Sequence, residues 1–253
     1  MAPSPSLRRS RPLRAVIFDA GNTLLRMNYS VIAAELLARG RPVTGAAVEE
    51  AELRARVRLD RHLGPRARPD AATVASDSTE SGTTQGRYLR YILEHLGITD
   101  EGEIEALARW RRGYNLPVGL WNVADPGAES ALRRVKAAGL VAGVISNSNG
   151  SVRSILEATG LAAHLDLIVD SAVVGVEKPD ARIFRIGLAE ARVAPEEAVY
   201  VGDLYSVDVL GARGVGMEAV LLDPRGFWGE RDCLQAVDLA AAVGLALHSR
   251  PPA

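Results

Sequence analysis

Short apolar segments recur along the chain, and each has about the length of a buried strand. They are rich in valine and isoleucine, which is typical of strands that are covered on both faces. These segments occupy residues 15–19, 141–146, 165–170, 198–202 and 219–223. Segments with helical periodicity alternate with them, at residues 127–138, 151–159, 181–191 and 206–214. The alternation predicts an α/β fold, a doubly wound parallel sheet with right-handed crossovers and a Rossmann-like core.

Residues 27–117 interrupt this alternation, because their apolar positions follow a helical period and none of their segments resembles a strand. We expect helices at residues 30–39, 45–62, 87–96 and 101–114. An all-helical cap inserted after the first strand explains this order, with a core made of residues 13–26 and 118–253. Residues 64–86 are polar and lack periodicity, so we expect a mobile loop there, with an ordered substrate lid as the alternative.

The composition is that of an ordinary globular protein and argues against several classes of partner. The 253 residues include 24% charged side chains and carry a formal net charge of -1, so neither nucleic acid nor an anionic membrane is an expected partner. No segment reaches the roughly 18 uninterrupted apolar residues that a transmembrane helix needs. Residues 1–12 contain several arginines but no apolar segment, which predicts a flexible basic tail rather than a signal peptide. Cys233 is the only cysteine, which favours a reducing, cytoplasmic setting, and no sequence pattern fixes an oligomeric state.

The end of the first predicted strand carries a carboxylate, Asp19, in the segment Val-Ile-Phe-Asp-Ala-Gly-Asn-Thr-Leu. In a parallel sheet of this type, ligands bind beyond the carboxyl ends of the strands. A carboxylate at that position is well placed to act as a nucleophile. Capping of the following turn is the ordinary alternative for a single strand-end aspartate.

The second predicted strand ends in Ser146 and Asn147, directly before a helix. A hydroxyl group at a strand end, next to a helix N-terminus, can hydrogen-bond phosphate oxygens. Simple capping of that helix by a nearby serine or asparagine explains the same residues.

Lysine is rare in this chain: of 30 basic residues, only Lys136 and Lys178 are lysines. A chain that uses arginine for general positive charge retains lysine where a compact ammonium group is needed. Lys178 follows the third strand by a short loop, where an ammonium group can neutralise both a carboxylate nucleophile and the anion it attacks. A surface lysine is the ordinary alternative.

Two carboxylates, Asp203 and Asp208, lie at the end of the fourth strand and the start of the next helix. Mg²⁺ binds one or two carboxylates together with waters and substrate oxygens, and Asp203 fits that role beside Asp19. Asp208 could bind the metal through a water, hold Lys178 in place or simply cap the helix.

Taken together, these four motifs resemble the haloacid dehalogenase-like hydrolase superfamily, in which they occur in this order on such a sheet. The resemblance covers residues 13–26 and 117–223, and a helical cap between the first two motifs is similar to the branch that contains many small phosphatases. It implies a phosphatase with an aspartyl-phosphate intermediate, a Mg²⁺ cofactor and a small phosphorylated substrate. The roles that it implies are Asp19 as nucleophile, Ser146 and Asn147 as substrate-binding residues, Lys178 as charge stabiliser, and Asp19, Gly21 (through its carbonyl), Asp203 and Asp208 as the metal site.

The chain departs from this family at position 21, where most of its phosphatases carry a second aspartate that acts as general acid and base. Gly21 occupies that position here, and Asn22 stands where glycine is usual. General acid–base catalysis contributes roughly 10²–10⁴-fold, so the loss matters. Three explanations remain: a substrate with a good leaving group, a proton donor from the cap or the substrate (His62 or His95, for example), or chemistry other than phosphate hydrolysis.

Two related activities also lack the second aspartate. L-2-haloacid dehalogenases keep the nucleophile but need no metal, and they usually lack the Gly-Asp pair that is intact here at Gly202 and Asp203. Phosphonoacetaldehyde hydrolases use a cap lysine, whereas the cap of this chain contains none. The sequence therefore favours a Mg²⁺-dependent phosphatase, with a dehalogenase-like hydrolase or a non-catalytic member that binds metal or ligand as alternatives.

Overall fold

The computed structural model describes residues 11–63, 79 and 81–248. Contacts divide the chain into two units, one made of Met1–Arg26 with Ala124–Ala253 and the other of Met27–Val123. The expected basic tail, except for its last two residues, and most of the expected loop at 64–86 lie outside the described residues.

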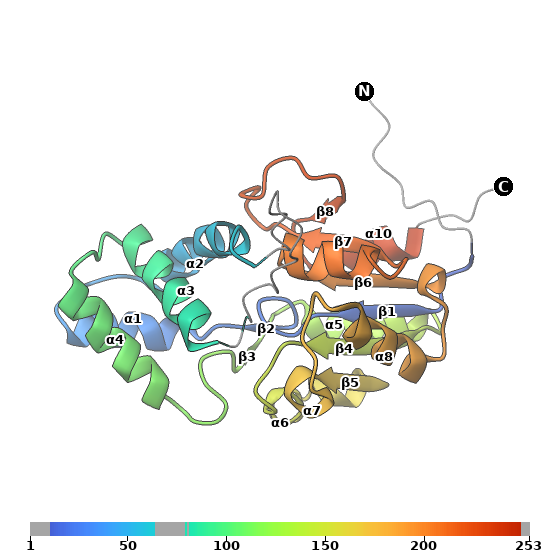
Figure 1. The fold of residues 1–253 in the computed structure, drawn as a ribbon, viewed down its shortest axis with the longest axis horizontal. Helices are drawn as coiled ribbons and strands as arrows, with labels where there is room; N and C mark the ends of the chain where they lie inside the picture. Colours follow the sequence, from blue (N-terminus) through green and yellow to red (C-terminus); the bar gives the residue numbers. More distant parts are fainter. Residues whose placement is uncertain (1–10, 64–78, 80, 249–253) are drawn as a thin grey trace, which may run out of the picture. The chain divides into compact units, whose positions relative to one another are not determined.

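The first unit is built on a sheet of six parallel strands in the order β5-β4-β1-β6-β7-β8 (Figure 1). The strands are β1 (Ala15–Phe18), β4 (Val141–Ser146), β5 (Leu167–Asp170), β6 (Ala198–Gly202), β7 (Glu218–Leu222) and β8 (Leu234–Ala236). Strand β1 lies between β4 and β6, and its four residues are fully buried, which explains their unbroken apolar character. Two further short strands, β2 (Leu25–Arg26) and β3 (Val123–Ala124), form a separate two-stranded sheet.

Helices cover both faces of the six-stranded sheet (Figure 1). Helices α5 (Ala128–Ala137) and α10 (Leu239–His248) contact one another and share one face. Helices α8 (Ala181–Ala191) and α9 (Leu210–Arg213) cover the other face, α8 over β4 and β5 and α9 over β7. The shorter elements are α6 (Val152–Ala158), α7 (Ser171–Val174), the turns Leu161–His164 and Pro195–Glu197, and a π-helical turn, Tyr205–Val209. This two-sided layering confirms the predicted α/β fold.

Several elements of this unit were missed by the sequence pattern, among them β8, α10 and the short α7 and β2, and one was assigned too simply. Strand β8 has three residues at the sheet edge, too few for a recognisable period. Helix α10 is apolar or small at almost every position, which hides its amphipathic period. The segment 206–214, predicted as one helix, is the π-helical turn followed by α9.

The described residues of the second unit form four helices, as the periodicity predicted: α1 (Tyr29–Ala38), α2 (Gly45–Asp60), α3 (Gly82–His95) and α4 (Glu101–Gly113). Each begins after a polar side chain that accepts a hydrogen bond from a backbone N–H three residues later, which satisfies one of the free donors of the first turn. These capping residues are Asn28, Thr44, Ser81 and Asp100.

Ser81 is the N-cap residue of α3, and the helix therefore begins five residues earlier than the sequence predicted. The N–H of Thr84 donates to Ser81 Oγ at 3.1 Å, so residues 82–86, expected to belong to the loop, are helical. Contacts also group residues 118–123 with the helical unit rather than with the core. The Asn28 N–H donates to the Leu120 carbonyl at 2.8 Å, which joins the beginning and the end of this unit.

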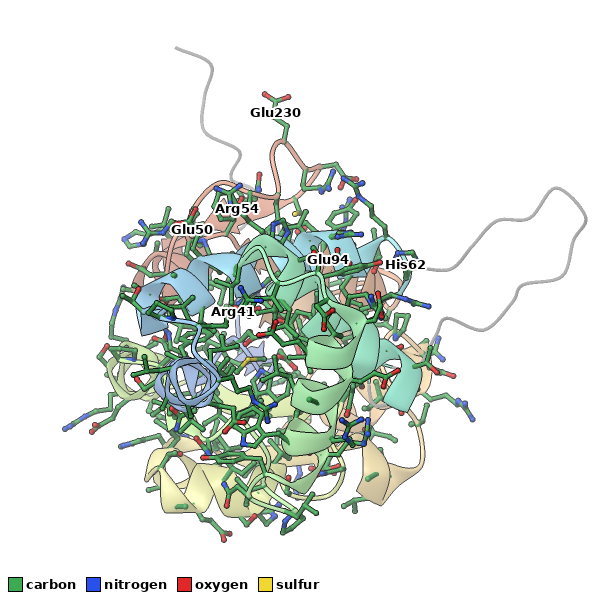
Figure 2. All side chains as sticks on the ribbon, turned by 90° about the vertical axis from the view of Figure 1, so that its left-hand side faces the viewer. Arg41, Glu50, Arg54, His62, Glu94 and Glu230 are labelled. Atoms are coloured by element: carbon green, nitrogen blue, oxygen red, sulfur yellow. The ribbon has the colours of Figure 1, made fainter. Side chains whose placement is uncertain are left out.

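The helical unit has a buried polar cluster and a charged surface. Glu52 is fully buried and accepts hydrogen bonds from Arg56, Tyr29 and Tyr88, so its charge is neutralised within the unit. On its surface, Glu50 pairs with Arg54 along α2 (Figure 2). Two further pairs join Arg58 to Glu94 and Arg41 to Glu103. Within the described residues, no helix combines the length and apolar character that crossing a bilayer would need.

Gly187 lies where α8 packs on the sheet, and it provides a test of that packing. A Cβ atom at position 187 would lie 2.5 Å from Ile145 Cδ1, so Gly187→Ala should force the helix away from β4. We expect this substitution to lower the free energy of unfolding by about 1–3 kcal/mol, measured by urea denaturation. Gly244→Ala in α10 is the control, because its nearest contact is the end of the Arg134 side chain at 3.9 Å. The control should leave stability unchanged or raise it, and equal losses in the two variants would contradict the packing.

Candidate active site

The order of the strands brings three sequence-distant motifs together at the carboxyl end of the sheet, where the parallel strands finish. Phe18, the last residue of β1, pairs with Val144 on one side and Val201 on the other. The next residue, Asp19, donates its N–H to the Val201 carbonyl at 2.8 Å, which extends this register by one position. Asp19 therefore follows the central strand at the edge where β4 ends in Ser146 and β6 continues into Asp203.

The ammonium group of Lys178 is at the centre of this site. Its Nζ lies 2.6 Å from Asp19 Oδ1, 2.7 Å from Asp208 Oδ1 and 3.0 Å from the Tyr200 hydroxyl. The Lys178 side chain is 2% exposed, so these three partners replace the water that a surface ammonium group would have. The structure thus excludes the alternative of a surface lysine.

Burial and charge act against one another on these groups. Burial raises the pKa of Asp19 to about 6, and the nearby Asp208 carboxylate adds to this, although Lys178 opposes both. Burial alone would lower the pKa of Lys178, but Asp19 and Asp208 outweigh it and hold the pKa well above its ordinary value. Lys178 is therefore protonated, and two carboxylates share one ammonium group.

Three buried carboxylates, those of Asp19, Asp203 and Asp208, form an acidic cluster. One oxygen from each lies within 4.8 Å of the others, a spacing at which a single divalent cation could contact them. Asp208 Oδ2 already accepts hydrogen bonds from the backbone N–H groups of Asp203 at 3.1 Å and Leu204 at 2.9 Å. With Lys178 on its other oxygen, Asp208 has the geometry of a residue that holds Lys178, one of the roles that its position in the sequence had left open.

Asn147 holds the main chain of Lys178. Its amide nitrogen donates to the Lys178 carbonyl at 3.0 Å, and its Oδ1 accepts from the Lys178 N–H at 2.7 Å. Ser146 is buried, and its hydroxyl donates to the Asn147 carbonyl at 3.3 Å. The structure thus places both residues beside the Lys178 loop, while a contact from either to substrate stays a prediction.

The turn after Asp19 explains one of the two departures from the family motif. Asn22 has a φ of 55°, in the left-handed region where asparagine is the side chain best tolerated after glycine. Leu25 donates its N–H to the Ala20 carbonyl at 2.8 Å and forms a β-bridge with Gly21, which closes the turn. Gly21 is not among the residues with positive φ, so its backbone does not require glycine.

The histidines considered as proton donors belong to the helical unit. His62 Nε2 lies 3.0 Å from the Tyr91 hydroxyl, and burial together with Arg54 and Arg58 lowers the pKa of His95. Participation of either histidine in the reaction stays a prediction.

Tyr200 is the member of the site that the sequence motifs did not assign. It occupies the middle of β6, in the segment Ala-Val-Tyr-Val-Gly, where the apolar pattern identifies the strand but gives the tyrosine no role. One signal was present, because a tyrosine in a strand buried on both faces must find a partner for its hydroxyl. The partner could be identified only from the tertiary structure.

Comparisons with known proteins identify the family of proteins to which this chain is similar. A model of the haloacid dehalogenase-like hydrolase family matches residues 13–216, which include every strand-end motif of the site. The chain belongs to this family. The human haloacid dehalogenase-like hydrolase domain-containing protein 3 is 31% identical over 217 residues, which cover 83% of this chain and 82% of that protein. The chain is accordingly a hydrolase of this superfamily.

Two further relatives of this hydrolase carry names that state an activity. A ribulose-1,5-bisphosphate 5-phosphatase from Halopiger xanaduensis is 34% identical over 182 residues, which cover 70% of this chain and 73% of that protein. The crystal structure of a 2-haloacid dehalogenase from Pseudomonas syringae pv. Tomato DC3000 superposes with a TM-score of 0.54 at 25% identity, covering 92% of this chain and 98% of that one. The family therefore includes both activities that the sequence had left as alternatives.

Gly202 tests whether the position of Asp208 matters for the reaction. A Cβ atom at position 202 would lie 2.4 Å from Asp208 Cγ, so Gly202→Ala should displace the carboxylate that holds Lys178. We expect a loss of hydrolytic activity of about 10²-fold, because small displacements of a positioned catalytic group have effects of that size. The measurement is steady-state kinetics alongside thermal denaturation.

Gly143→Ala is the matched control for this substitution. It adds the same methyl group to strand β4, on the other side of β1, where it meets the Leu167 side chain at 2.8 Å instead of a carboxylate. It should lower stability and leave the activity of the folded protein unchanged. Equal activity losses in the two variants would show that strand crowding, and not Asp208, is responsible.

Proposed function

We propose that this chain is a magnesium-dependent phosphatase that hydrolyses a small phosphorylated metabolite through an aspartyl-phosphate intermediate. The observation that supports it most directly is the buried contact of 2.6 Å between Asp19 and the Lys178 ammonium group, within a cluster that also contains Asp203. The relationship to a named phosphatase at 34% identity supports the same reaction. A cytoplasmic setting, expected from the single cysteine, is part of this proposal.

In the first step, a carboxylate oxygen of Asp19 attacks phosphorus in line with the ester oxygen. The P–O bond to the leaving group breaks, and the phosphoryl group is transferred to Asp19. In the second step, water attacks the phosphorus of the aspartyl phosphate, which releases inorganic phosphate and restores the carboxylate. Lys178 reduces the repulsion between the Asp19 carboxylate and the phosphate dianion, since its ammonium group already contacts the nucleophile.

The residues that would hold a Mg²⁺ ion are Asp19, Asp203 and the carbonyl of Gly21, with Asp208 beside them. This donor set fits the ion, because Mg²⁺ prefers oxygen ligands and the set includes two carboxylates. Lys178 contacts the Asp19 carboxylate and not that of Asp203, so negative charge is left for the ion to neutralise. When bound, Mg²⁺ would supply positive charge to offset the negative charge of the phosphoryl group.

The glycine at position 21 restricts the substrates that this site can process well. Without a carboxylate there, no side chain two residues from the nucleophile protonates a departing alkoxide. Acyl phosphates, anhydrides and aryl esters depart without such help, so these classes suit the site best. For an alkyl ester, the substrate or the helical unit would have to supply the proton.

Two alternatives remain as outcomes of the experiments. The missing carboxylate and the structural likeness to a 2-haloacid dehalogenase favour a dehalogenase-like reaction, in which Asp19 would displace halide from carbon. A non-catalytic member that binds metal or ligand would retain the cluster without turnover.

Substitution of the nucleophile tests the proposal. Wild-type protein should release phenolate from an aryl phosphate with Mg²⁺ and lose this activity with a chelator. Asp19→Asn should abolish turnover, because an amide cannot form the acyl phosphate. Asp223→Asn is the control, since Asp223 also follows a strand and is buried, but it binds the Phe227 and Trp228 N–H groups instead.

The control variant should keep most of the activity. Turnover that survives Asp19→Asn, or that ignores Mg²⁺, would exclude the proposed mechanism. Halide release from a 2-haloacid without metal would establish the dehalogenase reaction in its place.

Restoring the missing acid gives a second test. Gly21→Asp should raise kcat for alkyl phosphates by up to roughly 10²–10⁴-fold and kcat for aryl phosphates by less, because both gain a base for the water of the second step but only the alkoxide leaving group needs a proton. Gly21→Asn is the matched control, because asparagine has nearly the same shape as aspartate but no carboxyl group that could act as acid or base. No increase with Gly21→Asp, in a variant that folds normally, would indicate that another group already acts as the acid.

A further inference from the structure

Tyr200 reaches across the sheet from the strand that carries it. It lies on β6, and its fully buried side chain donates its hydroxyl proton to the carbonyl of Ile145 on β4 at 2.8 Å. Strand β1 separates β4 from β6 in the sheet, so the tyrosine side chain crosses the strand that leads to the nucleophile. Ile145 directly precedes Ser146, at the same edge as Asp19.

The same hydroxyl group also contacts Lys178, and the direction of both hydrogen bonds is determined. A tyrosine hydroxyl has one proton, and in this geometry that proton points to the Ile145 carbonyl, which can only accept. The hydroxyl oxygen is therefore free to accept from Lys178 Nζ at 3.0 Å. An ammonium group has three N–H donors, and among the described residues the Lys178 Nζ donates to three acceptors: Asp19, Asp208 and Tyr200.

Tyr200 differs from the other two acceptors in ways that bear on the reaction. Asp19 changes during turnover, because the proposed mechanism converts its carboxylate into an acyl phosphate, whereas Tyr200 and Asp208 do not react. Tyr200 is also neutral, so it fills the third position without adding a further negative charge to a site where two carboxylates already share one ammonium group. A fixed neutral acceptor keeps the ammonium group in place when the charge on Asp19 changes.

We propose that Tyr200 is a positioning residue, whose hydroxyl group fixes the Lys178 ammonium group against Asp19 and the transferred phosphoryl group. The inference rests on the proposed phosphatase function, since it assigns Lys178 the task of stabilising that group. It adds a residue on β6 to which the strand-end motifs assigned no role.

Tyr200→Phe tests the hydroxyl alone, because phenylalanine keeps the ring that lies 5.5 Å from Lys178 Nζ. We expect kcat for an aryl phosphate to fall roughly tenfold with KM little changed, since the lost interaction positions a group that acts in the transition state. Phe184→Leu is the matched control. Phe184 packs edge-on against the same ring, with centroids 5.3 Å apart, and its side chain has no polar atom that could hydrogen-bond to Lys178. Thermal denaturation of both variants separates a loss of stability from a loss of positioning.

The rarity of lysine provides a second readout that does not depend on activity. The chain contains two lysines, so selective ¹⁵N-lysine labelling gives two side-chain ammonium signals. Lys136 pairs with Asp166 on the surface and serves as the internal reference, and Lys136→Arg assigns the signals. In Tyr200→Phe, the Lys178 signal should shift and its protons should exchange with water several-fold faster, while Lys136 stays unchanged.

Phe184→Leu should leave the Lys178 signal and kcat close to those of the wild type. The proposal is overturned if Tyr200→Phe leaves the Lys178 signal unaltered, or if Phe184→Leu lowers kcat as much as Tyr200→Phe does. If wild-type protein hydrolyses no phosphate ester, the proposed function fails, and the ammonium signals still decide whether Tyr200 holds Lys178.

Discussion

The buried ammonium group of Lys178 is the interaction on which the rest of the site depends. A charge removed from water is costly unless partners replace its hydration, and here two carboxylates and one hydroxyl do so. Removing one partner of a buried ion pair typically costs about 3–5 kcal/mol, so each of these residues constrains the others. The cluster links the ends of β1 and β6 to the loop before α8, and it makes this end of the sheet a single electrostatic unit.

The parallel sheet makes this arrangement possible with few residues. Placing β1 between β4 and β6 brings Asp19, Ser146 and Asp203 to adjacent strand ends, although up to 184 positions separate them along the chain (203 minus 19). The same order allows Tyr200 to pass under β1 and reach β4. Rigid strands hold these side chains more accurately than loops would, which suits a reaction in which charge must be met at a fixed position.

The turn after Asp19 keeps a closed backbone geometry but lacks a carboxyl group two residues after the aspartate. Asn22 adopts the left-handed conformation that the turn requires, and Gly21 keeps an ordinary backbone while removing a carboxyl group. The contact between Asp19 and Lys178 is therefore retained, and under the proposed function the proton donor for the leaving group is what differs. Under the same proposal, the site favours substrates whose leaving groups need little protonation.

The sequence by itself determined the layers of the fold and most of the site. Unbroken apolar segments identified the strands, because strands buried on both faces exclude polar side chains, and the strand-end motifs identified Asp19, Lys178, Asp203 and Asp208 as candidates. The start of α3 at Ser81 and the short strand β8 were not predicted, since an N-cap contact and an edge strand of three residues leave little periodic signal in the sequence.

Only the tertiary structure decided what the candidates do to one another. Whether Lys178 lies at the surface or is buried between carboxylates depends on the strand order, which no local pattern encodes. The two-point contact of Asn147 with the Lys178 main chain and the reach of Tyr200 to Ile145 have the same origin. These are contacts between residues far apart in the sequence, and they form only when the sheet has brought the strand ends together.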